Sequence, residues 1–311
     1  MPAKSSAKFI DRYRIDDPER FRLAAFDCAD HGGLDLDKDK AKAMLAEDVD
    51  RLGELQERLY ADNRWAVLVV LQGMDTAGKD GIIEHVMGAV DPQGCVVHSF
   101  KAPSAEELDH DFLWRLATRL PERGRIGIFN RSHYEEVVVV RVHPEYLEPQ
   151  RLPEKLNGKD IWQQRFKSIR GFERHLARNG TLVLKFFLHV SKEEQRQRLL
   201  ARIEEPGKRW KFAKGDIAER KLWEKYMTAY EEAICATSRP YAPWYVVPAD
   251  HKRYARIIVA RAMVDALTRL DLKFPKVDRA ALKEMERIRE TLLAEGTQQR
   301  LKSRKPNRTS S

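Results

Sequence analysis

The sequence is poor in cysteine and lacks long apolar runs. Its three cysteines, Cys28, Cys95 and Cys235, are widely spaced in 311 residues and match no metal-binding pattern, so we expect reduced thiols in a cytoplasmic protein. No stretch approaches the roughly 18 apolar residues of a membrane span. The first residues (MPAKSSAKFIDRYRIDD) lack the apolar core of a secretion signal. These absences argue against a membrane protein and a secreted protein.

Acidic residues are in deficit, with 48 against 57 basic residues and a net charge of +9. A positive surface favours a polyanionic partner such as nucleic acid, polyphosphate or an anionic membrane. The alternative is a solvated basic surface with a basic tail, because the last residues (LKSRKPNRTSS) are polar and predict disorder. Charge alone does not distinguish these partners.

Short apolar runs alternate with segments of helical spacing. Strands are predicted at residues 65–72, 95–100, 126–129, 181–189 and 244–247. The main helices are predicted at residues 37–60, 79–90, 105–120, 133–140, 160–178, 191–204, 216–236, 251–270 and 278–295. Runs such as VLVVL do not alternate with polar residues, which is typical of strands buried on both faces. We therefore expect an α/β fold, with a parallel five-stranded sheet flanked by helices.

The chain is expected to contain one main domain. It covers residues 37–272, because no linker divides that stretch. Residues 1–36 show little periodicity and predict an N-terminal arm. Residues 273–311 predict a C-terminal helix followed by a basic disordered tail.

The segment GMDTAGKDG, residues 73–81, follows an apolar run and opens a helical stretch. A strand, a glycine-rich turn, a lysine and a helix form the usual context of a phosphate-binding loop. The glycines let backbone N–H groups turn inward, while the helix N-terminus and Lys79 add positive charge. Asp80 stands where the pattern has Ser or Thr, and the helix dipole favours it there. The alternative is an ordinary glycine-rich turn.

Asp75 lies inside this loop. A carboxylate beside bound phosphates repels them unless a cation lies between the two. We therefore expect Asp75 to contact Mg²⁺, directly or through water. A turn aspartate bonded to its own backbone is the alternative.

Polar side chains follow the third predicted strand, in FNRSHYEE (residues 129–136). Ligands of open α/β sheets gather at the carboxyl ends of the strands. Arg131 can grip a phosphoryl oxygen with two N–H groups. Glu135 can hold Mg²⁺ or water, accept a proton, or simply pair with Arg131 four residues away. His133 is a weaker candidate, because a lone histidine is more often structural than catalytic.

The segment EEPGKRWKFAKG, residues 204–215, combines a Pro-Gly break, four cations and two aromatic residues. Lys208, Arg209 and Lys211 are among its cations. A segment of this kind between two helices fits a lid that closes over phosphates. The alternative is an exposed basic loop.

The segments GMDTAGKDG, SFKAPSAEELDHDFLWR, FNRSHYEEVVVVRVH and EEPGKRWKF together resemble the polyphosphate kinase 2 family, over about residues 40–270. The resemblance implies a P-loop kinase fold similar to thymidylate kinase, with a lid. It implies phosphoryl transfer between inorganic polyphosphate and nucleotides, with Mg²⁺ or Mn²⁺. The implied partners are the adenine nucleotides AMP, ADP and ATP, with guanine nucleotides left open, in a homodimer or homotetramer. No specific nucleic acid and no membrane are expected as partners.

Carried over by position, the resemblance assigns catalysis to Asp75, Lys79, Arg131 and Glu135. Asp75 and Glu135 would hold the metal, and Arg131, His133 and Glu135 would bind the nucleotide. The implied phosphate-binding set is Gly73, Ala77, Gly78, Lys79, Asp80, Gly81, Lys208, Arg209 and Lys211.

Two positions bear on the subclass. In the branch that mainly uses nucleoside diphosphates, we expect Asp at the position of Asn130 and Asn at the position of Glu135. The residues present here are similar to the third class, which accepts both AMP and ADP. Glu135 would then determine the use of monophosphates.

The expected reaction is in-line transfer of the terminal phosphoryl group of polyphosphate to AMP and ADP. One rival is an ATP-dependent nucleoside monophosphate kinase, which differs in its donor; the basic lid favours a longer anion. The other rival is a non-enzymatic protein that binds polyphosphate or nucleic acid. Acids at positions 75 and 135 argue against it, because acids weaken plain anion binding.

Overall fold

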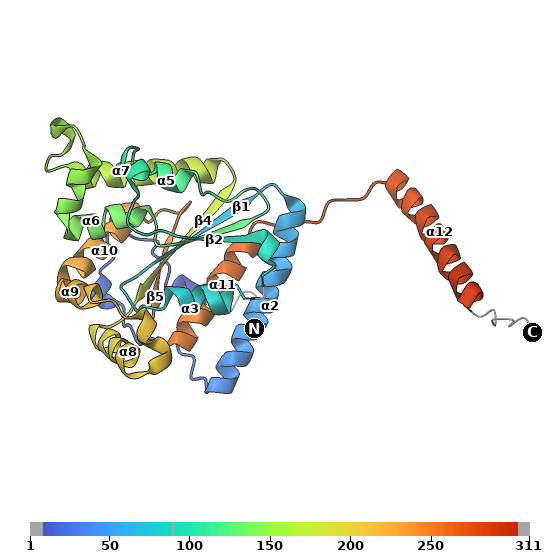
Figure 1. Ribbon diagram of the computed structural model, residues 1–311, viewed down its shortest axis with the longest axis horizontal. Coiled ribbons are helices and arrows are strands. Elements are labelled where there is room, and N and C mark those ends of the chain that lie inside the picture. Colours follow the sequence, from blue (N-terminus) through green and yellow to red (C-terminus); the bar gives the residue numbers. More distant parts are fainter. Residues whose placement is uncertain (1–8, 89, 304–311) are drawn as a thin grey trace, which may run out of the picture. The chain divides into compact units, whose positions relative to one another are not determined.

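Five apolar runs of the sequence form the strands of one parallel sheet (Figure 1). The computed structural model describes residues 9–88 and 90–303. The strands lie in the spatial order β2, β3, β1, β4, β5, and neighbouring strands run parallel. Their bounds are β1 (Ala66–Gln72), β2 (Cys95–Ser99), β3 (Ile126–Asn130), β4 (Thr181–His189) and β5 (Trp244–Pro248). The predicted α/β fold with a parallel five-stranded sheet is confirmed.

Helices and short 3-10 turns connect these strands. The α-helices are α2 (Lys38–Asp62), α3 (Lys79–Val86), α4 (Ala105–Leu108), α5 (Trp114–Ala117), α6 (Val139–Val142), α7 (Ile161–Arg178), α8 (Lys192–Glu204), α9 (Gly215–Lys221), α10 (Trp223–Thr237), α11 (Lys252–Thr268) and α12 (Arg279–Ser303). The 3-10 helices are η1 (Leu23–Ala25), η2 (Pro92–Gly94), η3 (His133–Glu136), η4 (Pro144–Gln150), η5 (Glu154–Leu156) and η6 (Pro206–Lys211).

Helices cover both faces of the sheet (Figure 1). On one face α11 packs against α2 and α3, and on the other α10 packs against α6 and α7. All residues of the central strand β1 and of the edge strand β5 are buried. Cover on both faces explains why these runs do not alternate with polar residues.

The helix predicted at residues 105–120 is interrupted. It begins with a capping box between Ser104 and Glu107 but ends after α4. The carboxylate of Asp111 then accepts a hydrogen bond from the backbone N–H of Leu113, at 2.9 Å. Such a local bond offers the backbone an alternative to the helix, and the short helix α5 follows.

Two further predicted helices are divided in the structure. Residues 133–140 form η3 and the start of α6, because the β-branched valines at 137–140 resist a regular helix. The helix predicted at residues 216–236 is divided into α9 and α10 at Leu222, whose backbone angles (φ −92°, ψ 15°) leave the helical region. The tight η3 turn places Glu135 directly beyond the end of β3.

The N-terminal segment is part of the main unit. Tyr13, Ile15 and Phe21 are buried, so the part of the predicted arm that is described packs against the core. The N–H of Ile15 donates to the carbonyl of Trp244 (2.9 Å), and the N–H of Val246 donates to the carbonyl of Tyr13 (2.8 Å). This antiparallel bridge covers the outer edge of β5, which would otherwise expose unpaired backbone groups.

A second unit begins at Phe274, and the first ends at Lys273. Its helix α12 occupies the segment predicted as the C-terminal helix and exposes Leu282, Met285 and Ile288. The end of the expected basic tail, residues 304–311, lies outside the described residues. Within the described part of the chain, no helix has both the length and the apolarity to cross a bilayer.

The packing of the N-terminal segment can be tested with Tyr13→Ala. This change removes a ring that is only 1% exposed, and it should lower the free energy of unfolding by about 3 kcal/mol through cavity formation. Urea denaturation measures the difference. Asp11→Ala, an exposed neighbour, is the control and should change stability by less than about 0.5 kcal/mol. Equal stability of the two variants would contradict the packing described above.

Candidate active site

The phosphate loop connects β1 to α3, as predicted. Gly73 has φ of +154°, and a Cβ atom there would lie 2.9 Å from the carbonyl oxygen of Leu188. Gly78 has φ of +111°. Only glycine adopts such angles at little cost. The turn therefore requires glycine at both positions, and it leads directly into the N-terminus of α3, where Lys79 begins the helix.

The side chain of Lys79 folds back over its own loop. Its Nζ donates to the carbonyl of Gly73 (2.6 Å) and to that of Met74 (3.3 Å). Burial, together with repulsion from Arg131, lowers the pKa of Lys79 to about 8, although nearby carboxylates, Asp75 foremost, oppose the shift. A bound phosphate would add negative charge and favour the ammonium form.

Arg198 on α8 holds the same loop by hydrogen bonds to its backbone. Its guanidinium donates to the carbonyl oxygens of Thr76 (2.9 Å) and Ala77 (3.2 Å). It also donates to the carbonyl of Ala249 (2.6 Å) and pairs with Glu194 (2.7 Å). No local pattern in the sequence assigns Arg198 this role, because the carbonyl groups that it holds are far away in the chain.

Arg131 lies between the two predicted acids. Its Nη2 is 2.7 Å from Asp75 Oδ1, and its Nη1 is 3.2 Å from Glu135 Oε2. Burial opposes the charged guanidinium, but the carboxylates of Glu135 and Asp75 outweigh it and hold the pKa of Arg131 above its usual value. The Arg131–Glu135 pair, one of the alternatives left open by the sequence, is present. It is accompanied by Asp75, so all three side chains converge.

Asp80 and His133 have partners within the fold. Asn130 Nδ2 donates to Asp80 Oδ1 at 2.9 Å, so the residue that replaces Ser or Thr ties α3 to the end of β3. His133 is 1% exposed, and its Nε2 lies 3.4 Å from Glu173 Oε1. The ring thus lies in a cavity wall with one nitrogen turned toward the core.

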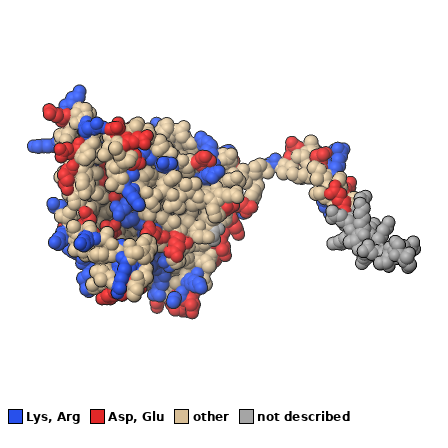
Figure 2. All heavy atoms as spheres, viewed as in Figure 1, with Lys and Arg blue, Asp and Glu red and all other residues tan. Residues whose placement is uncertain are grey.

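The predicted lid contains the 3-10 helix η6, and its cations point in different directions. Lys208 and Lys211 line the cavity beside the phosphate loop. Arg209 instead donates through Nε to the carbonyl of Ile203, at 2.9 Å, and is not among the residues that line that cavity. Figure 2 shows basic side chains, with acidic ones between them, over the neighbouring α8 and α9.

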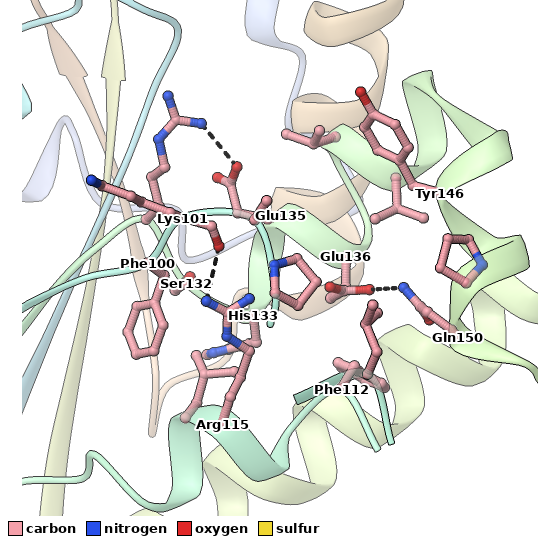
Figure 3. A pocket seen from close by; sticks show the side chains of 18 of the residues that line it. Phe100, Lys101, Phe112, Arg115, Ser132, His133, Glu135, Glu136, Tyr146 and Gln150 are labelled. Carbon is pink, nitrogen blue, oxygen red and sulfur yellow. Dashed lines mark hydrogen bonds and ion pairs between the residues drawn. The ribbon is translucent and has the colours of Figure 1, made fainter. Parts of the chain in front are cut away.

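Two cavities meet at the end of β3. The first, which we call the loop cavity, has a volume of about 410 Å³ and lies over the phosphate loop. The second, the aromatic cavity, has a volume of about 690 Å³ and is lined by Phe100, Phe112 and Tyr146 (Figure 3). Asn130 and Arg131 line both cavities. Arg131 therefore lies where contents of the two cavities could meet.

The loop cavity is strongly basic. Its cationic lining residues are Lys79, Arg131, Arg198, Arg202, Lys208, Lys211, Lys252 and Arg256. Burial and repulsion by Arg198 and Lys208 lower the pKa of Lys252, which shows how closely the like charges gather. Sequence reasoning missed Lys252 and Arg256. Both lie near the start of α11, just beyond β5, and the carboxyl ends of parallel strands share one edge.

Asp75 and Glu135 form a donor set that suits Mg²⁺ only in part. In the part of the chain that the structure describes, no three His, Cys, Asp or Glu side chains come together as metal ligands. Mg²⁺ is commonly held by one or two carboxylates together with substrate phosphates. Two carboxylates on either side of Arg131, next to a phosphate loop, fit a metal that arrives with the substrate.

The family model described as "Polyphosphate kinase 2" matches residues 35–275 of the sequence. The chain belongs to the polyphosphate kinase 2 family. The predicted class of enzyme, a polyphosphate kinase, is thereby confirmed. So is the P-loop kinase fold: the crystal structure of polyphosphate kinase 2 from Arthrobacter aurescens superposes with a TM-score of 0.83 at 42% identity, and the match covers 91% of this chain and 96% of that one.

Two similar members of this kinase family carry more specific names. An ADP-polyphosphate phosphotransferase from Rhodopseudomonas palustris is 52% identical over 82% of this chain and 89% of its own length. An AMP/ADP-polyphosphate phosphotransferase from Meiothermus ruber is 47% identical over 88% of this chain and 98% of its own length. This polyphosphate kinase thus resembles enzymes named for different acceptor ranges.

The pKa of Lys79 predicts how activity depends on pH. The ammonium form binds phosphate, and in the free kinase it is lost as the pH rises through about 8. The kcat/KM for polyphosphate should therefore decline above that value, by about tenfold per pH unit. A pH profile at constant ionic strength measures this. Lys79→Arg is the control, because its guanidinium stays charged and the decline should vanish. A flat profile for the unchanged kinase would contradict the assignment.

Alanine substitutions of the three lid cations should have unequal effects on the KM for polyphosphate. Lys208→Ala or Lys211→Ala should raise the KM for long polyphosphate by roughly two- to fivefold, since each removes one exposed charge from the loop cavity. Arg209→Ala removes the same charge outside that cavity and is the matched control. The difference should shrink at high salt. Equal effects of all three variants would mean that only net charge matters.

Proposed function

We propose that this kinase transfers the terminal phosphoryl group of inorganic polyphosphate to AMP and to ADP, giving ADP and ATP. One observation carries the proposal. A basic loop cavity and an aromatic cavity share Asn130 and Arg131. A donor that is all phosphate and an acceptor that carries a base would each find a matching cavity, with their reacting ends at Arg131.

The loop cavity suits a donor without a base. Among the described residues that line it, none is aromatic, and cations outnumber the carboxylates Asp75, Asp80 and Glu84. An ATP donor would need an apolar wall for its adenine beside the phosphate loop. A polyphosphate chain needs only positive charge along its length. The loop cavity therefore supports polyphosphate over ATP as the donor.

The aromatic cavity suits a nucleotide acceptor. Phe112 and Tyr146 offer surfaces for a base, and Lys101 and Glu135 lie toward the other end (Figure 3). A few polar groups among apolar walls are typical of small-molecule sites. The base would lie toward Tyr146 and the phosphate toward Arg131.

The transfer itself requires positioning and charge neutralisation more than covalent chemistry. Lys79 and the loop N–H groups would hold the donor, and Arg131 would neutralise negative charge on the phosphoryl group during its transfer. Asp75 and Glu135 would hold Mg²⁺ (or Mn²⁺), which supplies charge neutralisation when bound. The proposed arrangement keeps each carboxylate next to a cation, which limits repulsion of the phosphates.

Acceptance of both AMP and ADP is supported by the relative named for AMP and ADP and by Asn130 and Glu135, the residues that resemble the third class. The relative named for ADP alone makes the monophosphate the sharper test. We propose Glu135 as the residue that permits its use. Guanine nucleotides as further acceptors and a homodimer or homotetramer stay predictions.

The deciding experiment supplies Mg²⁺, long-chain polyphosphate and either AMP or ADP, and separates the nucleotides by chromatography. Product is expected from both acceptors. Parallel reactions with ATP and AMP, without polyphosphate, should form little ADP. Glu135→Asn should lower product from AMP more than product from ADP. Rapid turnover with ATP as donor would instead favour a nucleoside monophosphate kinase, and binding of polyphosphate without turnover would favour a binding protein.

A further inference from the structure

A buried ion pair lies on the core side of the proposed transfer site. Lys185 on β4 and Glu173 on α7 are both 0% exposed, with Nζ 2.7 Å from Oε2. A lysine in a strand that is buried on both faces is costly unless its charge is paired and hydrogen-bonded. Neither residue lines the loop cavity or the aromatic cavity, so the pair contacts no predicted substrate.

Every donor of this lysine is satisfied. Besides Glu173, Nζ donates to the Tyr134 hydroxyl and to the carbonyl of Thr237, both at 2.9 Å. The Tyr134 hydroxyl lies 2.8 Å from Glu173 Oε1 and 2.9 Å from Thr237 Oγ1. These four residues, which we call the buried quartet, connect β4, α7, α10 and η3.

The quartet is connected to η3 through Tyr134, next to residues that line the cavities. Tyr134 is fully buried and stands between Arg131 and Glu135 in the chain, and His133 next to it approaches Glu173 as well. The Tyr134 side chain faces the core, whereas Arg131, His133 and Glu135 line the aromatic cavity. The core contacts of η3 and its active-site contacts are thus made by neighbouring residues.

A strained residue lies between β3 and η3. Arg131 has φ of +66°, a left-handed conformation that a non-glycine residue keeps only when its surroundings hold it there. Locally, the Ser132 hydroxyl accepts from the N–H of Tyr134 (3.2 Å), and Gln72 donates to the same hydroxyl (3.3 Å). The quartet adds a fixed point on the core side of η3, and Arg165 holds the end of η3 through the carbonyl and the carboxylate of Glu136 (both 2.9 Å).

A buried ion pair is a poor source of stability, because apolar residues of equal volume often serve a core as well. What such a pair supplies is a single geometry. We propose that the buried quartet is a positioning device for phosphoryl transfer: it fixes η3 so that Arg131 and Glu135 stay at the meeting point of the two cavities. The inference rests on the proposed function of that site.

The first test is Tyr134→Phe, which keeps the ring in the core and removes only the hydroxyl. The kcat should fall by about tenfold, since small displacements of reacting groups are costly. The KM for polyphosphate should stay near its normal value, because α3, α8 and α11 form most of the loop cavity. A variant with reduced melting temperature but unchanged kcat would overturn the inference.

The second test removes both charges together, with Glu173→Leu and Lys185→Met in one chain. These apolar replacements leave no unpaired charge in the core. The expected result is a folded enzyme with a similar loss of kcat. The matched control is Asp48→Leu with Arg261→Met, an ion pair (2.9 Å) of a buried arginine and a half-buried aspartate that lines neither cavity. Its kcat should stay unchanged; an equal loss in both double variants would overturn the inference.

The third test asks whether the hydroxyl acts through the transfer site. Tyr134→Phe and Glu135→Gln should together cost less than the product of their separate effects on kcat, because each disturbs the same arrangement. Effects that simply multiply would overturn the inference.

An Arg131→Ala enzyme with normal kcat would instead show that the proposed function itself is wrong. A slow Arg131→Ala enzyme beside a normal Tyr134→Phe enzyme would reject the positioning role alone.

Discussion

The site depends on one electrostatic arrangement, a single guanidinium held between two carboxylates at the edge of the sheet. Two polyanions must approach each other in this enzyme, and each repels the acids that would bind a metal. Arg131 resolves part of this conflict, because its positive charge pairs with both Asp75 and Glu135 and offsets part of their negative charge before any substrate binds. The arrangement requires three segments to end at one place: β1 with its loop, β3, and η3.

The sheet order explains why these segments meet. β1 lies at the centre of the sheet with β3 beside it, and Leu71 at the end of one strand is paired with Asn130 at the end of the other. Parallel strands bring their carboxyl ends to the same edge. The phosphate loop and the Arg131 turn therefore emerge side by side, and α8 and α11 bring further cations to that edge from residues far along the chain.

Local motifs made much of this predictable. The glycine-rich loop and the Arg131–Glu135 spacing are short patterns whose chemistry follows from a few neighbouring residues, and both are present. Arg209 was predicted to bind phosphate with Lys208 and Lys211, but unlike them it does not line the loop cavity, because composition does not determine which way a side chain leaves a 3-10 turn. The prediction of one continuous helix over residues 105–120 was wrong for a similar reason. The Asp111 side chain accepts a hydrogen bond from the backbone and so competes with the helix.

Contacts between distant segments were harder to foresee. Apart from Glu194, the partners of Arg198 are carbonyl oxygens, which no sequence pattern marks. Lys185 did carry a signal, because a lysine in the run TLVLKFFLH must find a partner in the core. The identity of that partner depends on how α7 crosses β4, which is a matter of packing.

The bridge between the N-terminal segment and β5 has a consequence for how this chain folds. Tyr13 and Val246 are joined by a backbone hydrogen bond, although more than two hundred residues separate them in the sequence. Contacts of such long separation form slowly, because a large loop must close first. On the ribosome the segment around Tyr13 emerges well before β5 and must wait for that strand to be synthesised. Its exposed apolar side chains make that interval the one in which a chaperone would be most useful.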